Sequence, residues 1–222
     1  MRPMLLLALF LGLLTLGWVS WRGALSRRRS AETLQPAIVK QPVNFATRTF
    51  DPSAPPVEMP PLTSGENAEC DSNFLSSANV SSETERRDAT HATLTITQIK
   101  MRLQLNVTIW VPAGVSQHVM EHEEGHRQIS ENYYQTADQL AGQIAARYIG
   151  KQIELSGADL DAESQKALQQ TATEITEEYG RELNTQPSQL LYDSITDHSR
   201  NEVVAADAVA HALKNASIEP GR

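Results

Sequence analysis

The strongest constraint on the fold is a stretch of strict alternation between apolar and polar residues in the middle of the chain. Seven apolar side chains recur at every second position, and they are Ile99, Met101, Leu103, Leu105, Val107, Ile109 and Val111. Because successive side chains of a strand point to opposite faces, this pattern predicts a strand with one face on a core and one facing water. Leu94 and Ile96 alternate in the opposite phase, so we expect a turn or bulge near Thr97 and Gln98. A further strand is predicted around residues 70–80, with a polar loop after it.

A helical pattern follows this strand. The sequence Pro-Ala-Gly at residues 112–114 ends the sheet region, and Ser116 is suited to cap a helix. Apolar residues and two histidines then recur at intervals of three and four as far as Tyr148, which predicts one long amphipathic helix. A second helix is expected from Asp161 and a last one over residues 201–214, with a loop at Pro187 between them.

The first part of the chain has a different character. An apolar run over residues 4–21 is flanked by Arg2 and by four further arginines, which predicts a signal peptide or N-terminal membrane anchor over residues 1–29. We therefore expect an exported protein, periplasmic or secreted, which residues 4–21 could tether to the inner membrane. Seven prolines predict an extended spacer over residues 30–64, in which Val43, Phe45 and Phe50 could add one short strand. The folded domain is expected over residues 65–218.

Charge and cysteine usage exclude several classes of partner and site. Without residues 1–30 the chain has 14 basic and 27 acidic residues, a formal charge of −13. Such a domain repels nucleic acid and anionic lipid, so nucleic acid is excluded as a partner. Cys70 is the only cysteine, which excludes an intrachain disulfide and a cysteine-based zinc site.

Residues 122–126 read His-Glu-Glu-Gly-His and carry the clearest chemical signal. Positions four apart lie on the same face of a helix, so His122 and His126 can point both imidazoles at one metal ion. Glu123 is then placed to take a proton from water bound to zinc. The alternative is a charged, solvated helix face with two incidental histidines. The placement of both histidines on the inward stripe favours the metal site.

A zinc ion held by two histidines needs at least one more protein ligand. Glu174 and Glu178 flank the apolar stripe of the second helix at a suitable spacing, although a solvated acidic face explains each of them better. The other candidate is His198, which ends the segment Tyr-Asp-Ser-Ile-Thr-Asp-His at residues 192–198. The residues alone leave this choice open.

The combination of H-E-E-G-H with Y-D-x-x-T-x-H about 70 residues later resembles a bacterial family of predicted secreted zinc-dependent proteases. The resemblance covers roughly residues 94–211, whereas residues 30–90 do not match the pattern of the family. It implies that His122, His126 and His198 are the metal ligands and that Glu123 is the catalytic base. It also implies an export signal and a strand-rich first half.

Other side chains near the second motif have two interpretations each. Tyr192 could donate a hydrogen bond to the oxyanion of a tetrahedral intermediate, or it could be an aromatic core residue. Asp193 or Asp197 could orient a ligating imidazole, or cap the following helix. The strand over residues 99–111 could offer an edge to which an extended peptide pairs.

We therefore expect an α+β, zincin-like domain in which a small antiparallel sheet is followed by a long metal-binding helix and further helices. The expected function is that of a zinc-dependent peptidase of the cell envelope, with Zn²⁺ as cofactor and a peptide or protein as substrate. The main alternative is a catalytically inactive, metal-stabilised binding module. A metal-dependent hydrolase of another bond and an anchored structural protein with a coincidental motif are further alternatives. The oligomeric state is not predicted.

Overall fold

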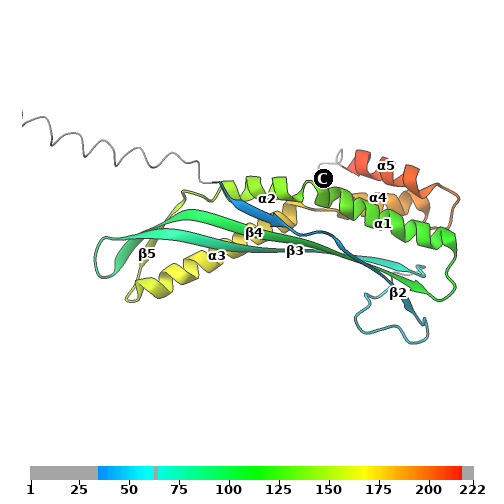
Figure 1. The fold of residues 1–222 in the computed structure, drawn as a ribbon, viewed down its shortest axis with the longest axis horizontal. Coiled ribbons are helices and arrows are strands. Elements are labelled where there is room, and N and C mark those ends of the chain that lie inside the picture. The colour runs from blue at the N-terminus through cyan, green and yellow to red at the C-terminus, as the bar shows by residue number, and fades with distance from the viewer. Residues whose placement is uncertain (1–34, 63–64, 217–222) are drawn as a thin grey trace, which may run out of the picture. The chain divides into compact units, whose positions relative to one another are not determined.

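The computed structural model describes residues 35–62 and 65–216. In chain order the elements are β1 (Ala37–Lys40), β2 (Asn44–Phe50), β3 (Glu69–Arg86), β4 (His91–Pro112), α1 (Gln117–Gln135), α2 (Ala137–Ala146), β5 (Gln152–Ser156), α3 (Leu160–Glu182), α4 (Gln186–Thr196) and α5 (Ala205–Asn215) (Figure 1). The predicted signal peptide or anchor over residues 1–29 lies outside the described residues. Within the described ranges, no helix combines the length and the apolar character that crossing a membrane requires.

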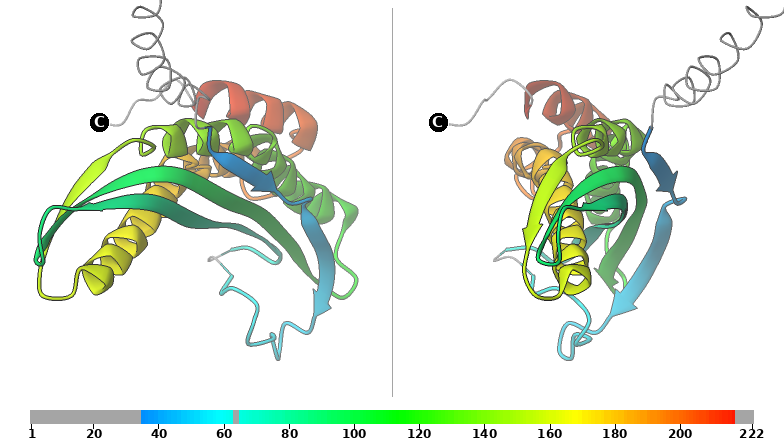
Figure 2. Two further views of the ribbon diagram at one scale, coloured as in Figure 1. Left: turned by 60° about the vertical axis from the view of Figure 1, so that its left-hand side comes forward. Right: turned by 90° about the vertical axis from the view of Figure 1, so that its left-hand side faces the viewer.

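Strand β4 is the centre of the sheet and confirms the alternation read from the sequence. Strand β3 pairs antiparallel with one edge of β4 along almost its whole length. Because a strand has only two edges, the other three strands share the opposite edge of β4: β5 antiparallel at residues 91–95, β1 parallel at 100–103 and β2 parallel at 106–112 (Figure 2). Both edges of β4 are therefore occupied, and the prediction that a peptide pairs with this strand is wrong.

The predicted fold class, a zincin-like α+β domain with a small antiparallel sheet followed by helices, is also wrong. The fold is α/β, and its five-stranded sheet is mixed because β1 and β2 run parallel to β4. Strand β5 follows α1 and α2, so strands and helices are not separated along the chain. The error arose because β1 and β2 come from the proline-rich segment. Their sequences carry no long alternation, and their backbone hydrogen bonds to β4 define them as strands. The short strand expected around residues 43–50 corresponds to β2.

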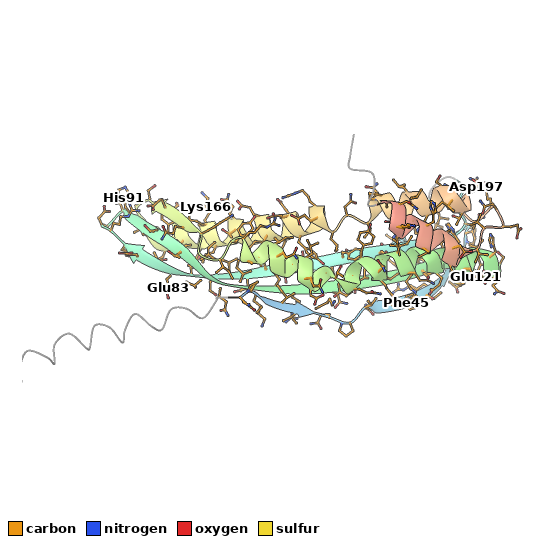
Figure 3. All side chains as sticks on the ribbon, turned by 90° about the horizontal axis from the view of Figure 1, so that it is seen from above. Phe45, Glu83, His91, Glu121, Lys166 and Asp197 are labelled. Atoms are coloured by element: carbon orange, nitrogen blue, oxygen red, sulfur yellow. The ribbon has the colours of Figure 1, made fainter. Side chains whose placement is uncertain are left out.

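The helices lie over one face of the sheet, where the main core joins β4 to α1, α2 and α3 (Figure 3). Ala92, Leu94 and Ile96 point into this core, and so do the alternating residues from Ile99 to Val107. Two series of opposite phase reach the same face because the pairing with β3 shifts by one residue between Ser81 and Ser82. The bulge predicted near residues 97 and 98 is thereby confirmed.

The elements after β4 differ from the prediction in three places. The single long helix is interrupted at Thr136, which separates α1 from α2. Pro187 lies in the first turn of α4 and not in a loop, at a position where proline costs no backbone hydrogen bond. Strand β5 was not predicted. The capping role of Ser116 is confirmed, since its side chain accepts a hydrogen bond from the backbone N–H of Val119.

Candidate metal centre

Helix α1 positions the first histidine pair. His122 and His126 lie one turn apart, and their Nε2 atoms are 3.2 Å from each other. His122 and Glu123 are both 5% exposed, which confirms that this part of the motif faces the interior. This side of α1 faces the interior because apolar residues of the helix, such as Ile129 and Tyr134, are buried along it.

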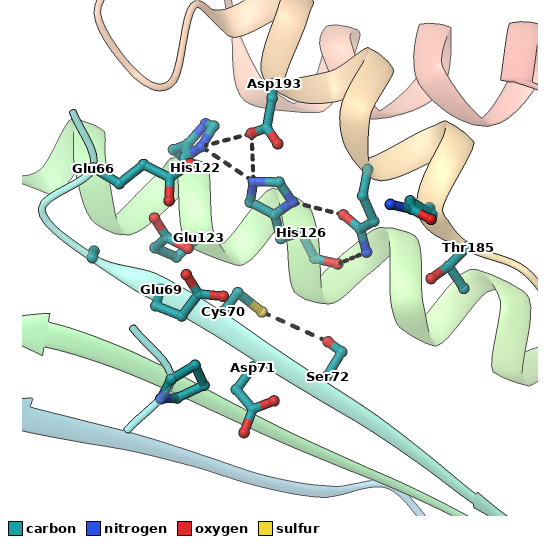
Figure 4. Close-up of a pocket in the computed structure, with 14 residues that line it drawn as sticks. Glu66, Glu69, Cys70, Asp71, Ser72, His122, Glu123, His126, Thr185 and Asp193 are labelled. Carbon is teal, nitrogen blue, oxygen red and sulfur yellow. Dashed lines mark hydrogen bonds and ion pairs between the residues drawn. The ribbon is translucent and has the colours of Figure 1, made fainter. Parts of the chain in front are cut away.

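Helix α4 brings a carboxylate to the two imidazoles. The Oδ1 atom of Asp193 is 2.9 Å from His126 Nε2 and 3.4 Å from His122 Nε2 (Figure 4). Three ligand atoms bound at about 2.0–2.1 Å to one tetrahedral ion are roughly 3.3 Å apart, so the observed triangle has the size of one face of such a site. His122, His126 and Asp193 therefore form a group that could hold a metal ion.

The hydrogen-bond network is compatible with a metal ion between these atoms. Gln189 donates through Nε2 to the carbonyl of His126 and to Ser130 Oγ, which turns its Oε1 towards His126 Nδ1 at 2.6 Å. Nδ1 is then the protonated nitrogen of His126, and the lone pair of Nε2 faces Asp193. Oδ1 of Asp193 is buried and accepts no hydrogen bond from any described residue. Two lone-pair atoms 2.9 Å apart in a buried place require a proton or a metal ion between them.

The ionisation of Asp193 and His122 suits metal binding, whereas the contact with Asp193 outweighs burial and raises the pKa of His126. Burial alone raises the pKa of Asp193, but the facing imidazoles of His122 and His126 outweigh it and hold this pKa below the usual range. Burial lowers the pKa of His122, which favours its neutral form. Carboxylate and neutral imidazole are the forms in which these side chains ligate metals.

A cavity of about 390 Å³ opens onto the group, and it is rich in carboxylates. Glu123 lies in it beside Glu69 (Figure 4). Burial, with the charges of Glu69 and Glu66 added and that of His126 opposing, raises the pKa of Glu123 to about 8. Burial and the neighbouring Glu66 raise the pKa of Glu69 to about 7. Lysine and arginine are absent from the described lining of the cavity.

Tyr192, predicted as a catalytic residue, packs against the rings of both histidines. Its ring is fully buried and stacks on that of His122, with centroids 5.0 Å apart and planes inclined by 18°. Its hydroxyl donates to the backbone carbonyl of His122 at 3.1 Å. A Cβ atom at Gly125 would collide with this hydroxyl and with the ring, so the glycine of the motif permits the close approach of α4.

The predicted third ligands lie in different places. His198 is close to the group but does not complete it: its Nδ1 is 3.8 Å from Asp193 Oδ1 and 2.9 Å from Glu66 Oε1. On α3, Glu178 accepts a hydrogen bond from the hydroxyl of Tyr148, and Glu174 accepts one from Gln170. In the part of the chain that the structure describes, neither glutamate belongs to a group of potential metal ligands.

Gln189 and Glu66 were not predicted as residues of this site, and Asp193 was expected to orient a ligating imidazole or to cap a helix, not to be a ligand. Gln189 and Asp193 are four positions apart on α4, so a helix assigned to residues 186–196 would have placed both on one face. Glu66 carries no local signal, because it lies between the proline-rich segment and β3. Asp197, the other residue considered for orienting an imidazole, bonds Arg200 instead.

Comparisons with protein-family models, with curated proteins and with solved structures found no match to this chain. The function is therefore inferred from the site itself.

Proposed function

We propose that this protein is a zinc-dependent peptidase of the cell envelope. The observation that carries the proposal is the triangle formed by His122 Nε2, His126 Nε2 and Asp193 Oδ1, at the mouth of a cavity that also contains Glu123. Two imidazoles and a carboxylate are a ligand set that zinc accepts, and three protein ligands leave one coordination position open. Zinc bound there supplies a Lewis acid that activates water and polarises a carbonyl group.

The chain's own residues have distinct roles in this proposal. The charge of a bound zinc ion would lower the pKa of Glu123 that burial raises, and its carboxylate would then accept a proton from the attacking water and pass it to the leaving amine. Gln189 holds the ring of His126 through Nδ1, as outer partners of ligating histidines do. Tyr192 stacks on the ring of His122. Because its hydroxyl donates a hydrogen bond to a backbone carbonyl, we give it no role in contact with the reacting groups.

The third ligand separates two versions of the site. The distances favour Asp193, whereas the resemblance of the motifs implies His198. In both versions the ligand comes from the segment 192–198, which begins about 70 residues after His122 and is packed against the histidine helix by Tyr192. The envelope location is proposed from the apolar segment over residues 4–21 and from the same resemblance.

The test uses the full-length chain and compares three variants. We expect the wild type to bind zinc, measured by mass spectrometry of the metal, and to cleave members of a random peptide library. His122→Ala should lose metal and cleavage together. Glu123→Gln should keep the metal and lose cleavage by about 10²–10⁴-fold, because only the proton acceptor is removed. Glu124→Gln is the matched control, since Glu124 pairs with Arg127 outside the cavity, and it should retain both properties.

Two results would contradict the proposal. A wild type that takes up no zinc excludes a zinc peptidase. Stoichiometric zinc without cleavage of any peptide supports the metal-stabilised binding module instead.

A further inference from the structure

A second group of metal-ligating side chains adjoins the first. Glu66 Oε1, His198 Nδ1 and an Asp193 oxygen lie within 4.8 Å of one another, and all three residues are partly buried. Glu66 comes from the segment before β3 and His198 from the turn after α4, so two distant parts of the chain meet beside Asp193. Asp193 is common to this group and to the group with His122 and His126.

The backbone around His198 is held in an unusual conformation. Asp197, His198 and Ser199 have φ angles of 48°, 52° and 64°, the left-handed region that residues other than glycine rarely adopt. Three such residues in succession persist only where surrounding contacts impose them, and such places are often functional sites. Here the turn directs the imidazole of His198 towards Glu66 and Asp193.

The charge of the cavity is a second, independent observation. Its described lining contains five carboxylates, and they belong to Glu66, Glu69, Asp71, Glu123 and Asp193. It contains neither lysine nor arginine to offset them. Burial raises the pKa of Glu69 to about 7 and that of Glu123 to about 8, so protonation removes part of this charge. A divalent cation beside Glu66 would offset part of the remainder.

We propose that the centre is binuclear and that a second divalent cation binds Glu66, His198 and Asp193. The Asp193 carboxylate, whose Oδ1 faces both His126 Nε2 and His198 Nδ1, then belongs to both metal sites. Paired ions about 3.5–4 Å apart are an established arrangement in hydrolases, aminopeptidases among them. This inference rests on the proposed function, because it takes the His122–His126–Asp193 group as the first metal site.

A single-ion site is the competing explanation. In it, Glu66 accepts a hydrogen bond from His198 Nδ1 and orients the ring, whose Nε2 then ligates the one ion. Both explanations require Glu66 and His198, but they predict different numbers of bound ions.

The decisive measurement is the stoichiometry of the metal-stripped, full-length protein titrated with Zn²⁺, by calorimetry and by mass spectrometry of the metal. The wild type should saturate at two ions per chain, whereas Glu66→Gln and His198→Ala should each saturate at one. Glu58→Gln and His211→Ala are the matched controls, because Glu58 pairs with Arg48 and His211 belongs to neither group. Both controls should bind two ions.

Cadmium substitution gives a second readout. The wild type loaded with ¹¹³Cd²⁺ should show two NMR resonances, and Glu66→Gln should show one. Far-UV circular dichroism checks that each variant is folded. If His198→Ala does not fold, the metal count of Glu66→Gln decides between one and two ions, because this substitution preserves the size and shape of the side chain.

A wild type that saturates at one ion overturns the proposal. A Glu66→Gln variant that keeps the wild-type count and binds more weakly does so too, because Glu66 would then only orient His198. The two proposals fail separately. Two bound ions without peptide cleavage leave the binuclear site standing and remove the peptidase function, whereas cleavage with one bound ion does the reverse.

Discussion

Replacing the glycine inside the histidine motif tests how closely α1 and α4 are packed. In Gly125→Ala the new Cβ atom would overlap the hydroxyl and the ring of Tyr192. Tyr192 is fully buried and is held between the rings of His122 and His126, so it cannot move aside without cost. We therefore expect this substitution to destabilise the protein, although alanine is the better helix former.

The magnitude follows from three contributions. Overpacking of a filled interior costs about 1–3 kcal/mol. Loss of the hydrogen bond from Tyr192 to the carbonyl of His122 costs about 1 kcal/mol. The higher helix propensity of alanine stabilises the folded state by about 1 kcal/mol and offsets part of this loss. The net loss in the free energy of unfolding is about 2 kcal/mol, and the affinity for zinc should fall as well because His122 loses its stacking partner.

The assay is urea unfolding of the full-length protein, followed by circular dichroism. Gly180→Ala is the matched control, because Gly180 also lies within a helix but, apart from its chain neighbours and the nearby backbone of that helix, no described atom lies within 4 Å of its Cβ position. It should stabilise the protein by up to about 1 kcal/mol. The two glycine substitutions should thus have opposite signs. A Gly125→Ala variant that is as stable as the wild type refutes the close packing of α4 on the motif.

Three further predictions concern the residue that orients His126, the N-cap of α3 and the turn at Asp88. Gln189→Leu removes the acceptor for His126 Nδ1, so the Kd for zinc should rise about 10–100-fold in chelator competition, and an unchanged Kd contradicts the orienting role. Asp159→Ala removes the N-cap of α3 and should lower the free energy of unfolding by about 1 kcal/mol in urea; no change would show that water replaces the cap. Backbone and side-chain hydrogen bonds with Thr90 and His91 lower the pKa of Asp88 from 3.8 to about 2, so its ionised form stabilises the fold above pH 3.8 and this contribution is lost as the pH falls through 2. Asp88→Asn should therefore lower the Tm at pH 6 and approach the wild type near pH 2, whereas a constant difference contradicts the assignment.

Several elements of the fold could be predicted because their signals are local. The alternation over residues 99–111 defines a strand buried on one face, and the phase change before it defines a bulge. The cap at Ser116 was also visible in the sequence. These features depend on side chains a few positions apart, which is the range over which backbone geometry sets periodicity.

The site could be predicted in part for the same reason. The spacing of His122, Glu123 and His126 shows that they share one turn of a helix, and the apolar stripe shows that this turn faces inward. The partner that the structure places against them, Asp193, lies on a different helix. The sequence indicated the segment 192–198 but not which of its side chains meets the histidines, because helix α4 was taken for a loop.

The amino-acid sequence by itself determined the central strand, the inward histidine pair and the interval at which a second motif follows them. Only the tertiary structure decided that β1 and β2 of the proline-rich segment run parallel to β4, and that Glu66 contacts His198. Strand partners and converging side chains depend on how distant segments are brought together. That arrangement results from the packing of the whole chain, and no short stretch of residues encodes it.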